Sequence, residues 1–276
     1  MMRQFRQVDV FTATPYLGNP LAVVLGADGL TTEQMQQFAH WTNLSETTFV
    51  LTLEDQAADY LVRIFMPTGE LPFAGHPTLG TCHAWLEAGG QPRTSGRVVQ
   101  QCGAGLVAVR QDDQGLAFAA PPLLRTGPVE PELAARVAAI LGLDRDEIVD
   151  MQWADNGPGW IAVLLASADA VLAVRPGPTD MDLGIAGPYP PGSAAAFEVR
   201  AFFPKDGSTT EDPVTGSLNA ALAQWLLATG RAKAPYLASQ GTVLGRRGQV
   251  RISQDDDGTI WVGGSIVTCV SGTVQL

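Results

Sequence analysis

Cysteine is scarce in this sequence, and the cysteines present form no recognisable metal or disulfide pattern. Only Cys82, Cys102 and Cys269 occur among 276 residues. An odd and sparse set is typical of a protein from a reducing compartment, and no Cys or His pair has the spacing of zinc ligands. We therefore expect three inert, buried thiols and no metal site.

Long apolar segments are missing as well, and we expect no leader. The longest apolar run covers residues 160–166, whereas a membrane-spanning helix needs about 20 apolar residues. The opening segment, MMRQFR, lacks the apolar stretch of a signal peptide. These features predict a cytoplasmic protein without a membrane partner.

Positive charge is in short supply. The chain has 17 Lys and Arg against 28 Asp and Glu, which gives a net charge of −11. Such a surface repels phosphate backbones and anionic lipids, so the sequence predicts no nucleic-acid partner and no docking on membranes. A small acidic substrate remains compatible, because a local site can oppose the field of the whole molecule. Apolar residues make up 46% of the chain, enough for one large or two modest folded domains.

Sequence signatures of bound cofactors are also missing. The chain has no GxGxxG string after a strand-like run, no P-loop and no HExxH string. We therefore predict a protein that works without a cofactor.

What the chain does contain is a long internal repeat. Three strings of the first half recur in the second half in the same order, and a chance origin for all three is implausible. The matching stretches are 63–67 with 200–204, 85–86 with 225–226, and 107–118 with 250–261. The sequence therefore predicts two pseudo-symmetric domains, 1–125 and 126–276, joined by a Pro/Gly-rich junction. The last strands are expected to be able to cross to the first half.

Each half combines short strand-like runs with helices, which predicts an α+β fold. Surface helices are predicted at Thr32–Thr42 and Pro131–Leu141 from helical spacing and end signals. Two further helices, 78–88 and 217–229, are apolar nearly all round and must be surrounded. The strands are predicted at 60–65, 106–109, 116–119, 197–203, 249–252 and 260–262. Each half is therefore expected to be a curled, mostly antiparallel sheet around a central helix.

Both surrounded helices begin in glycine-marked turns, at residues 72–78 and 211–217. The start of a helix carries unpaired N–H groups and the positive end of the helix dipole. We expect Thr78 and Ser217 to cap these helices. If the two starts face one cleft, they would bind a ligand with two acidic groups, or with one acidic and one polar group.

At this point the sequence resembles a known family, the PhzF-like isomerases of the phenazine-biosynthesis type, which have the diaminopimelate-epimerase fold. The motifs that carry the resemblance lie in order along nearly the whole chain. They are VDVFT at 8–12, GNP at 18–20, LSETTFV at 44–50, GHPT at 75–78, EDPVTGS at 211–217 and QG at 240–241. The resemblance implies two pseudo-symmetric domains with the site between them, and a homodimer.

The resemblance also assigns roles to individual residues. It implies that Glu46 removes a proton from one carbon of the substrate and returns it to another, with His76 and Asp212 as the other catalytic residues. Short hydroxyl residues around Glu46 predict its partial burial, which raises the pKa of a carboxyl group. Residues implied in substrate binding are Asn19, Gly75, Thr215, Gly216 and Ser217.

The resulting hypothesis is an isomerase that shifts a proton within a small carboxylate-bearing metabolite. One alternative is a racemase or epimerase of the same fold, with Glu46 and a second group as bases. Racemases of this fold place one cysteine at each helix start. This chain has Gly75-His76 at the first start and Thr215-Gly216-Ser217 at the second. The other alternative is a non-catalytic metabolite-binding protein, in which the Glu46→Ala substitution would leave ligand affinity unchanged.

The three catalytic candidates are far apart in the sequence. If the two halves face each other across a cleft, Glu46, His76 and Asp212 should line one pocket, with a volume of roughly 300–1,000 Å³.

Overall fold

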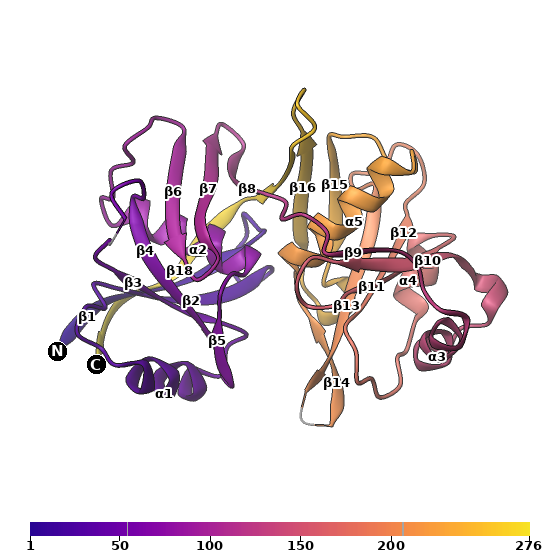
Figure 1. The fold of residues 1–276 in the computed structure, drawn as a ribbon, viewed down its shortest axis with the longest axis horizontal. Helices are drawn as coiled ribbons and strands as arrows, with labels where there is room; N and C mark the ends of the chain where they lie inside the picture. Colours follow the sequence, from indigo (N-terminus) through magenta and orange to yellow (C-terminus); the bar gives the residue numbers. More distant parts are fainter. Residues whose placement is uncertain (54, 206) are drawn as a thin grey trace. The chain divides into compact units, whose positions relative to one another are not determined.

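The computed structural model describes residues 1–53, 55–205 and 207–276. It is an α+β protein, as predicted, and its chain divides into two compact units (Figure 1). Unit 1 consists of Met1–Ala119 and Gly263–Leu276, and unit 2 consists of Ala120–Val262. The division falls a few residues before the predicted boundary at 125, and the last strand lies with unit 1.

Unit 1 is a sheet with two helical crossovers. Its strands are β1 (Met2–Val10), β2 (Asn19–Leu25), β3 (Thr47–Leu51), β4 (Tyr60–Met66), β5 (Gly69–Leu71), β6 (Arg97–Cys102), β7 (Gly105–Asp112), β8 (Gly115–Ala119) and β18 (Ile266–Gln275). Its helices are α1 (Thr32–Thr42) and α2 (Gly75–Glu87). Neighbouring strands pair antiparallel, except that β2 pairs parallel with β3 and β4 pairs parallel with β6. The helices α1 and α2 lie in the two connections between parallel strands, and β18 pairs antiparallel with β1.

Unit 2 has the same succession of strands. They are β9 (Arg125–Pro128), β10 (Ile148–Asp155), β11 (Ile161–Leu165), β12 (Leu183–Pro188), β13 (Phe197–Lys205), β14 (Ser208–Asp212), β15 (Tyr236–Gln240), β16 (Gly248–Gln254) and β17 (Ile260–Gly264), whose last two residues belong to unit 1. Its helices are α3 (Pro131–Leu141), α4 (Ala168–Ala173) and α5 (Gly216–Ala228), with short 3₁₀ turns η1 (Arg145–Glu147) and η2 (Thr242–Leu244). Here β11 pairs parallel with β12 and β13 pairs parallel with β15, and α4 and α5 lie in those connections.

The two units therefore share one strand order, as the sequence repeat requires. The strands β1 to β4 correspond to β10 to β13, and the hairpin β4–β5 corresponds to β13–β14. The registers agree as well, because Phe65 of β4 pairs with Glu70 while Phe202 of β13 pairs with Glu211. The antiparallel strand β18, which lies beside β1, corresponds to β9, which lies beside β10.

The central helices α2 and α5 are the two that the sequence predicts to be surrounded. Most of their side chains are buried, because neither helix has a continuous polar face. Their predicted caps are wrong: Ala74 and Thr215 stand at the N-cap positions, and neither makes a side-chain cap hydrogen bond. Thr78 lies inside the helix, where its hydroxyl donates to the Ala74 carbonyl at 2.9 Å.

The surface helices α1 and α3 have the predicted bounds. At α1, the Thr31 hydroxyl accepts from the Gln34 N–H and the Gln34 side chain accepts from the Thr31 N–H, which forms a capping box. Helix α3 begins at Pro131 and ends before Gly142, which adopts the left-handed conformation. Apolar side chains of these helices pack on the sheets of their own units.

Within the described part of the chain, no helix is long and apolar enough to cross a membrane. The same residues contain no group of three or more His, Cys, Asp or Glu side chains that could hold a metal ion. Cys82 and Cys102 are buried thiols and Cys269 is a half-buried one.

Candidate active site

Two of the predicted catalytic residues are in contact within unit 1. Glu46 immediately precedes β3, and His76 is the second residue of α2. The His76 Nε2 atom lies 3.3 Å from the Glu46 Oε2 atom, and the exposed fractions of the two side chains are 6% and 14%. The predicted partial burial of Glu46 is confirmed. A parallel crossover and a central helix thus place a carboxyl group and an imidazole side by side.

Asn19 contacts the other nitrogen of the same imidazole. It is the first residue of β2 and is fully buried, and its Nδ2 atom lies 3.4 Å from His76 Nδ1. If the amide donates to Nδ1, the ring proton stands on Nε2 and faces the Glu46 carboxylate. The Asn19 amide group thus orients His76, and its predicted contact with the substrate stays a prediction.

Burial controls the charge of this imidazole. Removal of the ring from water lowers the pKa of His76 to about 3. We therefore assign a neutral imidazole at neutral pH, whose Nε2 atom lies against Glu46 without a hydrogen bond and whose Nδ1 atom accepts from Asn19.

The backbone before Asn19 is held by a buried carboxylate. The Gly18 N–H donates to Asp9 Oδ2 at 2.9 Å, and the exposed fraction of Asp9 is 2%. A side chain at Gly18 would not fit, since its Cβ would lie 2.2 Å from the Val10 carbonyl oxygen. Sequence reasoning quoted both residues in motifs but assigned no role to Asp9.

The predicted residues of unit 2 form a hydrogen-bonded group at the start of α5. The Thr215 hydroxyl donates to Asp212 Oδ2 at 2.5 Å, and the Gln240 Nε2 group donates to the Thr215 hydroxyl at 2.9 Å. Gln240 Oε1 accepts from the Thr215 N–H at 2.9 Å and from Asn219 Nδ2 at 2.8 Å. Gln240 and Asn219 thus fix the loop that carries Asp212.

The first turn of α5 has two further partners that sequence reasoning missed. The Trp160 indole N–H donates to the Ser217 hydroxyl oxygen at 3.1 Å, and Asn156 Nδ2 donates to the Ser217 carbonyl at 2.9 Å. Both partners come from the β10–β11 hairpin, and no local sequence signal ties this hairpin to residue 217.

The structure therefore groups the predicted site residues by unit. Asn19, Glu46, Gly75 and His76 lie together in unit 1. Asp212, Thr215, Gly216 and Ser217 lie together at the start of α5 in unit 2. A single pocket that holds Glu46, His76 and Asp212 stays a prediction.

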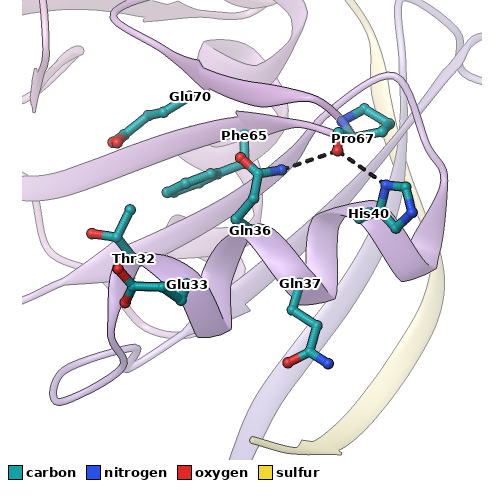
Figure 2. Close-up of a pocket in the computed structure, with 8 residues that line it drawn as sticks. All are labelled: Thr32, Glu33, Gln36, Gln37, His40, Phe65, Pro67 and Glu70. Atoms are coloured by element: carbon teal, nitrogen blue, oxygen red, sulfur yellow. Dashed lines mark hydrogen bonds between the residues drawn. The ribbon is translucent and has the colours of Figure 1, made fainter.

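Two surface hollows of the described residues lie away from the predicted site residues. One, of about 550 Å³, runs along α1 and is lined by residues such as Gln36, His40, Phe65 and Glu70 (Figure 2). Gln36 and His40 both approach the Pro67 carbonyl, which ties α1 to the end of β4. A second hollow, of about 580 Å³, lies along α3. Neither contains a predicted site residue.

Comparison with known proteins identifies the family. The model of the phenazine biosynthesis-like protein family matches residues 8–272. Antisense-enhancing sequence 1 of Schizosaccharomyces pombe is 33% identical over 292 residues, which cover 97% of this chain and 97% of that protein. The trans-2,3-dihydro-3-hydroxyanthranilate isomerase of Pseudomonas fluorescens is 33% identical, over 89% of this chain and 88% of the isomerase.

Solved structures agree on the fold. A phenazine biosynthesis protein of the PhzF family from Enterococcus faecalis superposes with a TM-score of 0.80 at 24% identity, over 100% of both chains. A hydroxyproline epimerase from Agrobacterium vitis superposes with a TM-score of 0.58 at 15% identity, over 99% of this chain and 92% of that one. The fold is thus shared with the PhzF-family protein and with the hydroxyproline epimerase. Since the family model spans nearly the whole chain and a curated isomerase matches most of it, the chain belongs to the phenazine biosynthesis-like protein family and is an isomerase.

Proposed function

We propose that this isomerase shifts a proton within a small carboxylate-bearing metabolite, with Glu46 as the acid/base group and without a cofactor. The observation that carries the proposal is the contact between Glu46 and a buried, neutral His76 that Asn19 orients. A carboxylate in contact with a buried, neutral imidazole meets no charged histidine that would compete for a proton, which suits a base.

The chemistry needs no further reactant. A C–H bond of the substrate breaks, its proton bonds to a Glu46 oxygen, and the electron pair is delocalised into the conjugated system that ends in the substrate's carboxylate. The Glu46 O–H bond then breaks, and a new C–H bond forms at another carbon of the same system. His76 keeps its proton throughout and stays in contact with Glu46.

For the residues of unit 2 we keep the predicted roles. Asp212, which the Thr215 hydroxyl holds, orients an amine or hydroxyl group of the substrate. The N–H groups at Gly75, Gly216 and Ser217 bind carboxylate oxygens, because helix starts favour anions. A homodimer is also part of the proposal, and gel filtration at micromolar concentration tests it.

The substrate class is proposed from the relative's name. The curated relative from Pseudomonas fluorescens is an isomerase of trans-2,3-dihydro-3-hydroxyanthranilate. We therefore propose a cyclic amino acid with an activated C–H bond as the substrate, and that compound as the first probe.

The test is a turnover assay in D₂O, followed by proton NMR, with a panel of cyclic and aromatic amino acids that includes this probe. The Glu46→Gln variant should lose turnover by about 10³-fold or more, because general acid/base catalysis contributes about 10²–10⁴-fold. Glu132→Gln, a substitution at an exposed carboxylate of α3, is the matched control and should retain turnover. Full activity of Glu46→Gln would overturn the proposal, and deuterium entering one stereocentre with inversion would identify a racemase or epimerase instead.

A further inference from the structure

The repeat identifies a residue of unit 2 that corresponds to Glu46. Thr47, which follows Glu46, pairs with Ala22 of β2 and Phe65 of β4. In unit 2, Leu183 pairs with Ile161 of β11 and Phe202 of β13. Since Phe65 and Phe202 hold the same place in the repeat, Leu183 corresponds to Thr47. Asp182, the residue before Leu183, therefore corresponds to Glu46.

The surroundings of the two carboxyl groups correspond as well. In unit 1 a carboxylate at the end of β1, Asp9, accepts the Gly18 N–H. In unit 2 a carboxylate at the end of β10, Asp155, accepts the N–H groups of Gly157 at 2.7 Å and Gly159 at 2.8 Å. The second residue of the central helix is His76 in unit 1 and Ser217 in unit 2. The place of Asp182 in this framework is thus beside the start of α5, as Glu46 is beside the start of α2.

Asp182 differs from Glu46 in having no partner for its charge. Its side chain is half-buried and makes no hydrogen bond or ion pair within residues 1–53, 55–205 and 207–276. Burial, and then the nearby charge of Asp155, raise the pKa of Asp182 to about 6. Partial burial of a carboxylate beside a second carboxylate lowers the stability of the fold. Because such groups cluster at functional sites, we interpret Asp182 as a functional residue.

A second polar side chain at the same helix start, Asn156, has one atom without a hydrogen-bond partner among the described residues. Asn156 donates through Nδ2 to the Ser217 carbonyl, which fixes the plane of its amide. Its Oδ1 atom is buried and has no hydrogen-bond partner among the described residues. The start of α5 thus has an unused acceptor, Asn156 Oδ1, on the residue after Asp155, whose charge acts on Asp182.

We propose that Asp182 contacts the substrate in unit 2, takes up a proton when the substrate binds and donates it in a hydrogen bond to the substrate's carboxylate. The inference rests on the proposed function, since it assumes a carboxylate-bearing substrate at the start of α5. The step balances without another reactant: a proton from solvent bonds to an Asp182 oxygen on binding and returns to solvent on release. Asn156 Oδ1 accepts from the amine or hydroxyl group of the same ligand.

Four titratable groups other than Asp182 have to be considered in assigning this proton uptake. Asp155 lies close to Asp182 and raises its pKa, and Asp212 lies in the loop before α5, held by Thr215. His76 and Glu46 belong to unit 1. Because the pKa of His76 is about 3, His76 takes up no proton near neutral pH, and Glu46 is replaced in the experiment below.

The test measures proton uptake on binding by isothermal titration calorimetry in buffers of different ionisation enthalpy. The protein carries Glu46→Gln to prevent turnover, and the ligand is trans-2,3-dihydro-3-hydroxyanthranilate, or another compound of the panel that the wild type converts. At pH 7.5 about 0.9 or more protons should be taken up per ligand, since a group of pKa about 6 is then almost fully ionised. Affinity should fall about tenfold per pH unit above pH 6.

The added substitution Asp182→Asn separates the possible outcomes. It should abolish the proton uptake and the fall of affinity above pH 6, because the amide is a permanent donor of similar shape. Asp256→Asn, in an exposed turn of unit 2, is the control and should leave the uptake intact. Undiminished uptake in Asp182→Asn would overturn the inference and leave the proposed function standing. If the wild type converts no compound of the panel, both are overturned.

Discussion

The same arginine–glutamate pair occurs in both units, in contrasting surroundings. Arg63 of β4 donates through two nitrogens to Glu70 of β5, at 2.7 and 2.6 Å. Arg200 of β13 donates in the same way to Glu211 of β14, at 3.0 and 2.7 Å. The exposed fractions of the side chains are 27% and 38% for the first pair, but 2% and 10% for the second.

The difference shows that the same arginine–glutamate pair forms an exposed contact in one hairpin and a buried contact in the other. Arg63 has a further bond to the Thr32 hydroxyl at the start of α1, and water solvates the rest of the pair. Arg200 is buried, and its Nη1 group donates to the carbonyls of Val171 at 3.1 Å and Val174 at 2.8 Å at the end of α4. Each arginine connects a crossover helix to the sheet of its unit. Only Arg200 is buried, so its loss would leave the charge of Glu211 buried without a partner.

The largest expected effect is the loss of stability when the buried arginine, Arg200, is removed. Arg200→Ala should lower the free energy of unfolding by about 3–5 kcal/mol, because it leaves the Glu211 carboxylate buried without its ion-pair partner. Arg63→Ala is the matched control, with an expected loss of about 1 kcal/mol or less for an exposed pair. Urea denaturation followed by circular dichroism measures both. Equal losses would show that burial does not distinguish the two pairs.

A second pair of variants compares two glycines that approach corresponding prolines. Gly241 has φ of 90°, and a Cβ there would lie 2.6 Å from the Pro213 carbonyl oxygen. A Cβ at Gly103 would lie 2.8 Å from Pro72 Cα, without a positive φ. Gly241→Ala should therefore cost about 2–3 kcal/mol of stability and Gly103→Ala less, about 1–2 kcal/mol. Thermal unfolding of both variants tests this order, which the reverse ranking would contradict.

A third prediction concerns the imidazole that unit 2 lacks. The pKa of His76 is lowered to about 3, so the unfolded chain binds a proton below pH 6.5 that the folded chain does not. Stability should therefore fall as pH decreases, by on the order of 2 kcal/mol between pH 6.5 and 5. The difference between wild type and His76→Gln in urea titrations at these two pH values isolates the effect. A difference that does not change with pH would mean that the folded protein binds the proton.

The smallest effect concerns Asp182. Because its pKa is raised to about 6, the folded chain holds the proton more tightly, and stability falls as pH rises from about 4 through 6. Asp182→Asn should therefore gain about 0.5–1 kcal/mol at pH 8 and nothing at pH 3, with the exposure of the group already discounted. Asp155→Asn, which loses an acceptor of two N–H groups, should be destabilised in the same thermal scans. A loss of stability in Asp182→Asn at pH 8 would assign it a structural role.

Local signals in the sequence were sufficient where a helix has side-chain or proline signals at its ends. The bounds of α1 follow from the helical spacing of its apolar residues, and those of α3 follow from Pro131 and Gly142. The starts of α2 and α5 were placed too late, since Ala74 and Thr215 make no cap bond. A proline such as Pro77 is also typical of a helix break. In the structure Pro77 lies in the first turn of α2, where an N–H group would have no partner in the helix.

The side-chain contacts of the site required more than local sequence. Residues 19, 46 and 76 come from a strand, a loop and a helix, and only the parallel pairing of β2 with β3 and the burial of α2 bring them together. The resemblance to a family supplied Glu46 and His76, whereas spacing alone left them as isolated polar residues. Asp182 was missed for the same reason, because its correspondence to Glu46 is a matter of strand register and not of sequence similarity.

The pairing of β1 with β18 has a consequence for how the chain is made. Unit 2 is one continuous segment and can fold as soon as Val262 has left the ribosome. Strand β1 is among the first segments synthesised, but its partner β18 follows unit 2. At about 5–20 residues per second, one edge of β1 waits for tens of seconds. During translation the nascent chain therefore presents an open strand edge that other chains can pair with, so slow translation or crowded expression should promote aggregation through unit 1 before unit 2.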